Sequence, residues 1–190
     1  MIINNINVNK VHWTRYIWNS KTNYMKRIIQ TTASFFLVLV LFACGGGKTS
    51  NITLETTVSA EGPFFQGGNS LVADIPLNIK ELVGDESLQE VTSVKVTKAV
   101  MQMEEGALAS FNNATLQFVS DANPMTTVAI INPISGEGES VNFTTSDEAE
   151  IESFFNEESF TVLLDLDFKE DQYLETVEAK VNMNLTIEYK

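Results

Sequence analysis

Strict alternation of apolar and polar residues near the end of the chain is the feature that most constrains its fold. Between residues 160 and 168, and again between 177 and 189, every second side chain is apolar. Successive residues of a strand point to opposite faces, so this period of two predicts two long strands with one buried face each. We expect the two to pair antiparallel around a polar turn at 169–173. Their buried faces are expected to hold Phe160, Val162, Leu164, Leu166 and Phe168, and Val177, Ala179, Val181, Met183, Leu185, Ile187 and Tyr189.

Shorter segments upstream also have the composition of strands. Turns that contain glycine, proline or asparagine separate them. In the longest segment, Val94, Val96 and Val100 share one parity and Ala99, Met101 and Met103 the other, which predicts a β-bulge or burial on both faces. Short strands at this spacing predict an all-β fold, an antiparallel β-sandwich of immunoglobulin-like or jelly-roll-like type. The segments are 52–58, 71–79, 91–103, 114–120, 126–132 and 141–144.

One short helix is expected near 146–156. Thr145 and Glu148 have the spacing of a capping box, and Ile151, Phe154 and Phe155 form a small apolar face. We expect this helix to cap an open end of the core.

The N-terminal region has the layout of an export signal. Lys26 and Arg27 precede an apolar run that ends at Phe42, and the run is too short for a membrane span, which needs about 20 apolar residues. Leu41, Phe42, Ala43 and Cys44 resemble the lipobox read by the bacterial lipoprotein signal peptidase, although Phe42 is larger than the usual residue there. The resemblance implies cleavage before Cys44 and acylation of that cysteine, which would anchor the chain in a membrane. The alternatives are an ordinary thiol at Cys44 or a plain signal peptide cut nearby.

These observations predict four segments. Residues 1–24 are expected to be a mis-annotated upstream extension, with the true start at Met25, and 25–43 a lipoprotein signal peptide. A flexible tether is expected at 44–51, rich in glycine, followed by a single domain at 52–190. That domain is long enough to bury one hydrophobic core.

Charge and composition restrict the chemistry of the exported part. Cleavage before Cys44 would leave seven lysines against 25 acidic residues, a net charge of −18. Such a surface repels phosphate backbones, so nucleic acid is not an expected partner. The same part contains no histidine, arginine or tryptophan, which excludes histidine-dependent catalysis and the usual histidine-cysteine zinc sites. We therefore do not expect an enzyme.

Acidic residues supply two further hypotheses. The carboxylates of Asp165, Asp167, Glu170 and Asp171 are close in sequence and could hold Ca²⁺, which prefers oxygen ligands, or could form a solvated face. No other cofactor is expected. Paired carboxylates can also hydrolyse glycans, but nothing in the sequence selects one pair among Glu104, Glu105, Glu157 and Glu158.

Three phenylalanines lie in expected loops. Phe64, Phe65 and Phe111 could form an exposed apolar binding patch, or they could plug the ends of the sandwich.

The second half of the chain, from Val91 to Lys190, loosely resembles the small β-sandwich lipoproteins of Bacteroidetes-type Gram-negative bacteria. Alternating strands and a late capping helix carry this resemblance, which transfers no functional residue. In that setting Gly45, which is not the aspartate associated with inner-membrane retention, implies an anchor in the outer membrane. The domain is expected to face the periplasm, and the cell surface is the alternative. The expected function is a non-enzymatic binding or scaffold module that contacts an envelope protein or glycan. A calcium-dependent carbohydrate-binding or adhesion domain and a carboxylate-dependent glycan hydrolase are the alternatives.

Overall fold

The computed structural model describes residues 47–190, which form one compact unit. The expected signal peptide, Leu41, Phe42, Ala43 and the lipidation site Cys44 lie outside the described residues. Within residues 47–190, none of the helices has the length and apolar character needed to cross a membrane.

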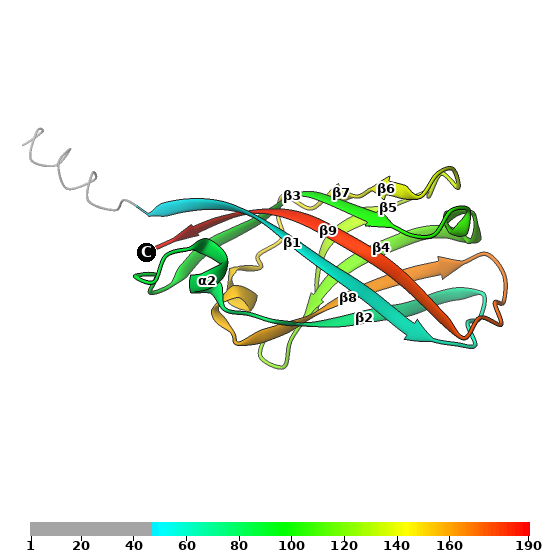
Figure 1. The fold of residues 1–190 in the computed structure, drawn as a ribbon, viewed down its shortest axis with the longest axis horizontal. Helices are drawn as coiled ribbons and strands as arrows, with labels where there is room; N and C mark the ends of the chain where they lie inside the picture. The colour runs from blue at the N-terminus through cyan, green and yellow to red at the C-terminus, as the bar shows by residue number, and fades with distance from the viewer. Residues whose placement is uncertain (1–46) are drawn as a thin grey trace, which may run out of the picture. The chain divides into compact units, whose positions relative to one another are not determined.

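Nine antiparallel strands account for most of the described chain (Figure 1). They form one hydrogen-bonded sheet in the order β6-β3-β9-β1-β2-β8-β4-β5-β7. The only helical elements between residues 47 and 190 are a one-turn α-helix, α2 (Ile79–Val83), and two 3₁₀ turns, η1 (Ala107–Ser110) and η2 (Glu152–Asn156). The strands are β1 (Lys48–Glu61), β2 (Gly67–Pro76), β3 (Val91–Gln102), β4 (Phe111–Val119), β5 (Thr126–Ile131), β6 (Ser140–Asn142), β7 (Thr144–Thr145), β8 (Ser159–Phe168) and β9 (Thr176–Tyr189).

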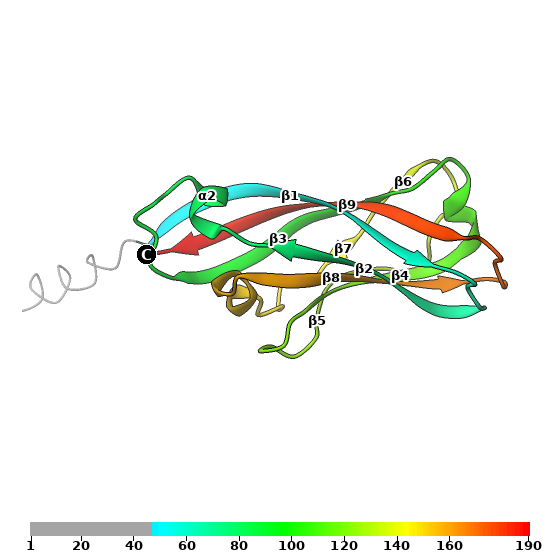
Figure 2. The ribbon, with the colours of Figure 1, turned by 60° about the horizontal axis from the view of Figure 1, so that its bottom comes forward.

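The sheet folds over on itself into two layers, as the all-β sandwich prediction requires. Figure 2 shows β1, β9 and β3 in one layer and β2, β8 and β4 in the other. The layers are joined between β1 and β2 by a single residue pair, Ser59 and Val72. The two edge strands of the sheet are β6, which pairs with β3, and β7, which pairs with β5. Because β7 follows β6 almost directly in the chain, the two edges of the sheet lie close together. The result is a nearly closed sandwich.

The core lies between the layers and consists of the alternating apolar side chains of both. Phe160 of β8 and Met183 of β9 are buried, as their parity predicts. Phe118 of β4 is fully buried, and its ring lies 4.7 Å from the ring of Phe160 and 5.9 Å from that of Phe154, measured between centroids. This aromatic cluster, which also includes Phe155, fills one end of the sandwich.

The predicted pairing of the last two strands is wrong. β8 pairs with β2 and β4, whereas β9 pairs with β1 and β3, so the two strands lie in different layers. The connection between them, residues 169–175, crosses from one layer to the other beside the β1–β2 connection. Three backbone hydrogen bonds join these connections. Phe64 N donates to Gln172 O at 2.9 Å, Gln172 N donates to Phe64 O at 2.8 Å, and Gly62 N donates to Glu175 O at 3.0 Å. Alternation fixes which face of a strand is buried but does not specify the neighbouring strand.

The mixed parity of β3 predicted a bulge or burial on both faces, and the structure shows a bulge. The register against β9 shifts between Val96 and Lys98, and the buried positions change there from Val94 and Val96 to Ala99 and Met101. One extra residue thus allows both parts of the strand to direct apolar side chains into the core.

The predicted helix at 146–156 is shorter than expected and begins later. Only Glu152–Asn156 is helical, as the 3₁₀ turn η2, although Ile151, Phe154 and Phe155 are buried as expected. The capping box does not start a helix because Ser146 N donates to Val128 O at 2.9 Å, which keeps this residue against β5.

An ion pair fixes the start of β1. Lys48 Nζ lies 2.6 Å from Asp85 Oδ2, and Asp85 Oδ1 also accepts hydrogen bonds from the Ser87 hydroxyl and N–H. The Lys48 ammonium, followed by the Ser87 donors, holds the pKa of the Asp85 carboxyl well below its usual value, and the same hydrogen bond raises the pKa of Lys48. Because the folded pKa of Asp85 is depressed, its stabilising contribution is complete above the unfolded pKa of about 4 and is lost as the pH falls through the folded value.

We expect replacement of Lys48 by methionine to raise the pKa of Asp85, since the ammonium is the largest cause of the shift. Titration of the Asp85 carboxyl by NMR would measure the change. The value should stay below that of an unperturbed aspartate because the two Ser87 donors remain. An unchanged pKa in Lys48→Met would contradict the pairing.

Candidate functional site

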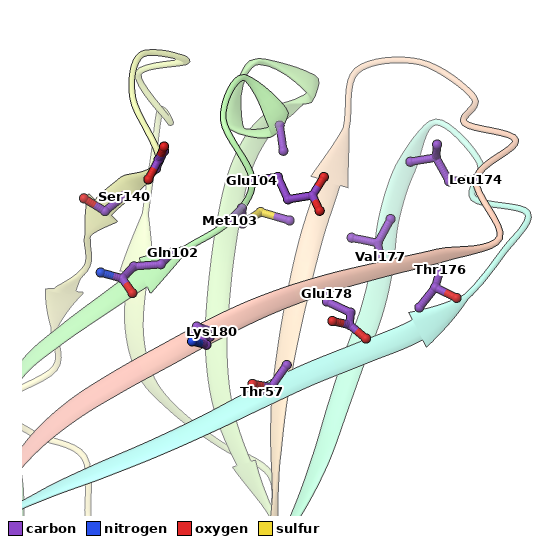
Figure 3. A pocket seen from close by; sticks show the side chains of 12 residues that line it. Thr57, Gln102, Met103, Glu104, Ser140, Leu174, Thr176, Val177, Glu178 and Lys180 are labelled. Atoms are coloured by element: carbon purple, nitrogen blue, oxygen red, sulfur yellow. The ribbon is translucent and has the colours of Figure 1, made fainter.

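An open groove lies where β3 separates from β9, and we call it the β9 groove (Figure 3). Pairing between the two strands ends at Gln102 and Lys180. After Gln102 the chain turns away from β9. The Met103 N–H donates to Glu139 O, 2.9 Å away, and not to β9. The divergence leaves a hollow of about 630 Å³. Its lining consists of Thr57, Gln102, Met103, Glu104, Ala107, Glu139, Ser140, Leu174, Thr176, Val177, Glu178 and Lys180.

One wall of the groove is a backbone edge without a strand partner. β9 pairs with β1 down to Thr176, but its pairing with β3 stops at Lys180. In an antiparallel ladder, backbone groups point alternately to the two neighbours. The bond from Gly62 N to Glu175 O shows that Glu175 points to β1, so Thr176 and Glu178 direct their N–H and C=O groups into the groove.

The opposite wall is held by close packing. The turn after β3 contains Gly106, whose φ of 81° is in the left-handed region, and continues into η1. Gly136 lies against Ala109 so closely that a Cβ on the glycine would come 2.9 Å from the Ala109 Cα. This contact joins η1 to the segment before β6.

The side chains of the groove make it acidic. Glu104, Glu139 and Glu178 are exposed, and Lys180 is the only cationic side chain in the lining. Two ion pairs occur within residues 47–190, Lys48 with Asp85 and Lys190 with Glu90, and neither lies in the groove. The carboxylates there are open to solvent and favour a cationic ligand.

The proposed aromatic patch is wrong for two of its three members. Phe64 stacks on Phe168 with a centroid distance of 5.2 Å, and Phe111 packs edge-on against the same ring at 4.8 Å. Both are buried, so they plug the end of the sandwich, which was the alternative interpretation. Phe65 remains 60% exposed. Tyr173 and Leu174, on the neighbouring connection, are also exposed, and Leu174 lines the β9 groove.

The four acidic residues of the calcium hypothesis are not brought together as a metal site. Asp165 and Asp167 share the outer face of β8, where Ser70 donates to Asp165 and Asn113 Nδ2 donates to Asp167 at 2.8 Å. Asp171 accepts from Gln66 N at 2.8 Å, and Glu170 is exposed. Within residues 47–190, no three acidic, histidine or cysteine side chains are grouped to hold a metal ion. Calcium binding stays a prediction.

The four glutamates of the hydrolase hypothesis lie in two places. Glu104 lines the β9 groove and Glu105 follows it in the exposed turn. Glu157 accepts hydrogen bonds from Ser120 and Asn123, which fixes the β4–β5 connection, and Glu158 is exposed. The structure therefore does not single out a catalytic pair.

The groove itself was not expected from the sequence. The Glu104–Gly106 segment was a usable signal, because two acidic residues and a glycine end the strand while β9 still continues. Only the register between β3 and β9 turns this ending into an unpaired edge.

Comparisons with known proteins indicate no family. No protein-family model matches the sequence, and no curated protein matches it. Among solved structures, the chain is similar to the Yersinia pseudotuberculosis TcaA-TcaB structure, with 13% identity and a TM-score of 0.37 over 83% of this chain. The match covers only 11% of the Yersinia pseudotuberculosis chain.

Two virus structures show a weaker likeness. Turnip yellow mosaic virus matches with 9% identity and a TM-score of 0.27, over 73% of this chain and 82% of the viral one. Desmodium yellow mottle tymovirus matches with 8% identity and a TM-score of 0.28, over 75% and 89%. Values this low do not indicate a shared function.

Proposed function

We propose that the protein is a lipid-anchored lipoprotein of the cell envelope and that its β-sandwich acts as a non-enzymatic binding or scaffold module. The observation that carries the proposal is the order of the chain. The lipobox-like residues Leu41–Cys44 come directly before a strand that starts at Lys48. Gly45, Gly46 and Gly47 would link the acylated cysteine to the domain.

The geometry of the domain supports a role in binding. β1 runs from Lys48 to Glu61, and 14 strand residues at roughly 3.3 Å each span about 45 Å. The β9 groove and the exposed Leu174 lie near the Glu61 end, since Thr176 pairs with Glu61. An anchor before Lys48 would therefore leave the groove at the far end of the domain. In this proposal the anchor lies in the outer membrane and the domain faces the periplasm or the cell surface.

We expect the mass of the membrane-extracted protein to equal that of residues 44–190 plus acyl chains. Intact mass spectrometry of the detergent extract measures it. The matched variant Cys44→Ala should lose the acyl mass. An unacylated product of the unaltered chain would remove the anchor and make a freely secreted binding domain the better account.

A further inference from the structure

We infer that the β9 groove binds an extended, cationic peptide segment of another protein, which adds to β9 as a short strand. This inference rests on the proposed binding function and names its site and class of partner.

The backbone carries the first part of the argument. Thr176 and Glu178 direct two N–H and two C=O groups into the groove, in the geometry that a further antiparallel or parallel strand would use. Strand addition of this kind satisfies the backbone of the peptide, while pockets for alternate side chains give specificity. A hollow of about 630 Å³ is within the size range of sites that enclose small ligands, and it suits a peptide of a few residues.

The charge of the lining selects the kind of peptide. Glu104, Glu139 and Glu178 surround the free edge, and only Lys180 opposes them. Residues 47–190 carry seven lysines against 25 acidic residues, so the field of the whole domain acts in the same direction. Lysine or arginine side chains on the peptide would meet complementary charge, whereas an acidic segment would be repelled.

Apolar groups on the floor and rim supply the remaining contacts. Val177, on the buried face of β9, borders the floor of the groove, Met103 lines it just after the end of β3, and the exposed Leu174 forms part of the rim (Figure 3). A peptide that alternates cationic and apolar residues would place one kind toward the carboxylates and the other toward these side chains, because successive residues of a strand face opposite ways.

The test uses the full chain in detergent and a fluorescent, blocked heptapeptide of alternating lysine and valine. Fluorescence anisotropy measures its dissociation constant. Two probes are compared with it: the same peptide with alternate backbone nitrogens methylated, and a peptide of alternating glutamate and valine. We expect each to bind at least tenfold more weakly, because the first loses hydrogen-bond donors and the second loses the charge complementarity.

Matched variants locate the site. Glu178→Lys changes the charge inside the groove, while Glu188→Lys makes the same change on the same face of β9, ten residues away. We expect the first to weaken peptide binding at least tenfold and the second to change it less than threefold. Equal effects of the two variants, or equal binding of the methylated peptide, would overturn the inference. So would binding of a neutral oligosaccharide that is lost in Glu178→Lys while the lysine-valine peptide fails to bind.

Failure of this inference is separate from failure of the proposed function. The same preparation is examined by intact mass, which reports acylation at Cys44 independently of any peptide. An acylated chain that binds none of the peptides would keep the lipoprotein proposal and remove the strand-addition site.

Discussion

Replacement of Phe118 by alanine is expected to lower the free energy of unfolding by about 3 to 5 kcal/mol, the range for buried phenylalanines. The ring is fully buried on β4 and contacts the rings of Phe154, Phe155 and Phe160. Its removal leaves a cavity that these side chains, held by β8 and η2, cannot fill. Urea denaturation followed by circular dichroism measures the change in the unfolding midpoint.

Phe65→Ala is the matched control for this prediction. The same atoms are removed, but the Phe65 ring is mostly exposed, so we expect a change within about 0.5 kcal/mol. A comparable loss of stability in both variants would mean that Phe65 is packed in the folded protein. A small effect of Phe118→Ala would contradict the position of the aromatic cluster in the core.

The fold class could be predicted because a strand with one buried face in a two-layer β-protein has apolar residues at every second position. The parity of apolar residues in β8 and β9 indicated their buried faces, and the mixed parity of residues 91–103 indicated a bulge or burial on both faces, of which the structure shows the bulge. The sequence contains no comparable signal for which strands are neighbours in the sheet. Any two amphipathic strands satisfy the same alternation, and β9 pairs with β1 and β3 over long registers that join distant parts of the sequence.

The candidate site was less predictable for the same reason. Phe64 and Phe111 belong to the core only because Phe168 lies between them, which depends on how the connections fold over the end of the sandwich. The β9 groove depends on where β3 separates from β9. The Glu104–Gly106 segment indicates where β3 ends, but the register that leaves β9 unpaired beyond that point cannot be read from composition or spacing.

The two connections that join the layers pack closely where they cross. Gly62 lies beside Leu174, and its N–H donates to Glu175 O. A Cβ at Gly62 would overlap the Leu174 carbonyl oxygen, closer than any contact between the two atoms allows. Because the obstacle is backbone, it cannot be relieved by a rotation of a side chain.

We therefore expect Gly62→Ala to lower the free energy of unfolding by about 2 to 4 kcal/mol, from overpacking and from weakening of the hydrogen bond to Glu175. The displaced connection carries Leu174 and leads into Thr176, so the variant should also weaken peptide binding in the β9 groove. Urea denaturation and fluorescence anisotropy measure the two effects. Gly68→Ala is the control, because a methyl group added at Gly68 would meet no atom within 4 Å and should be tolerated with little change. Equal stability of the two variants would show that the connections can separate at this crossing, and the fixed geometry of the groove would then lose its support.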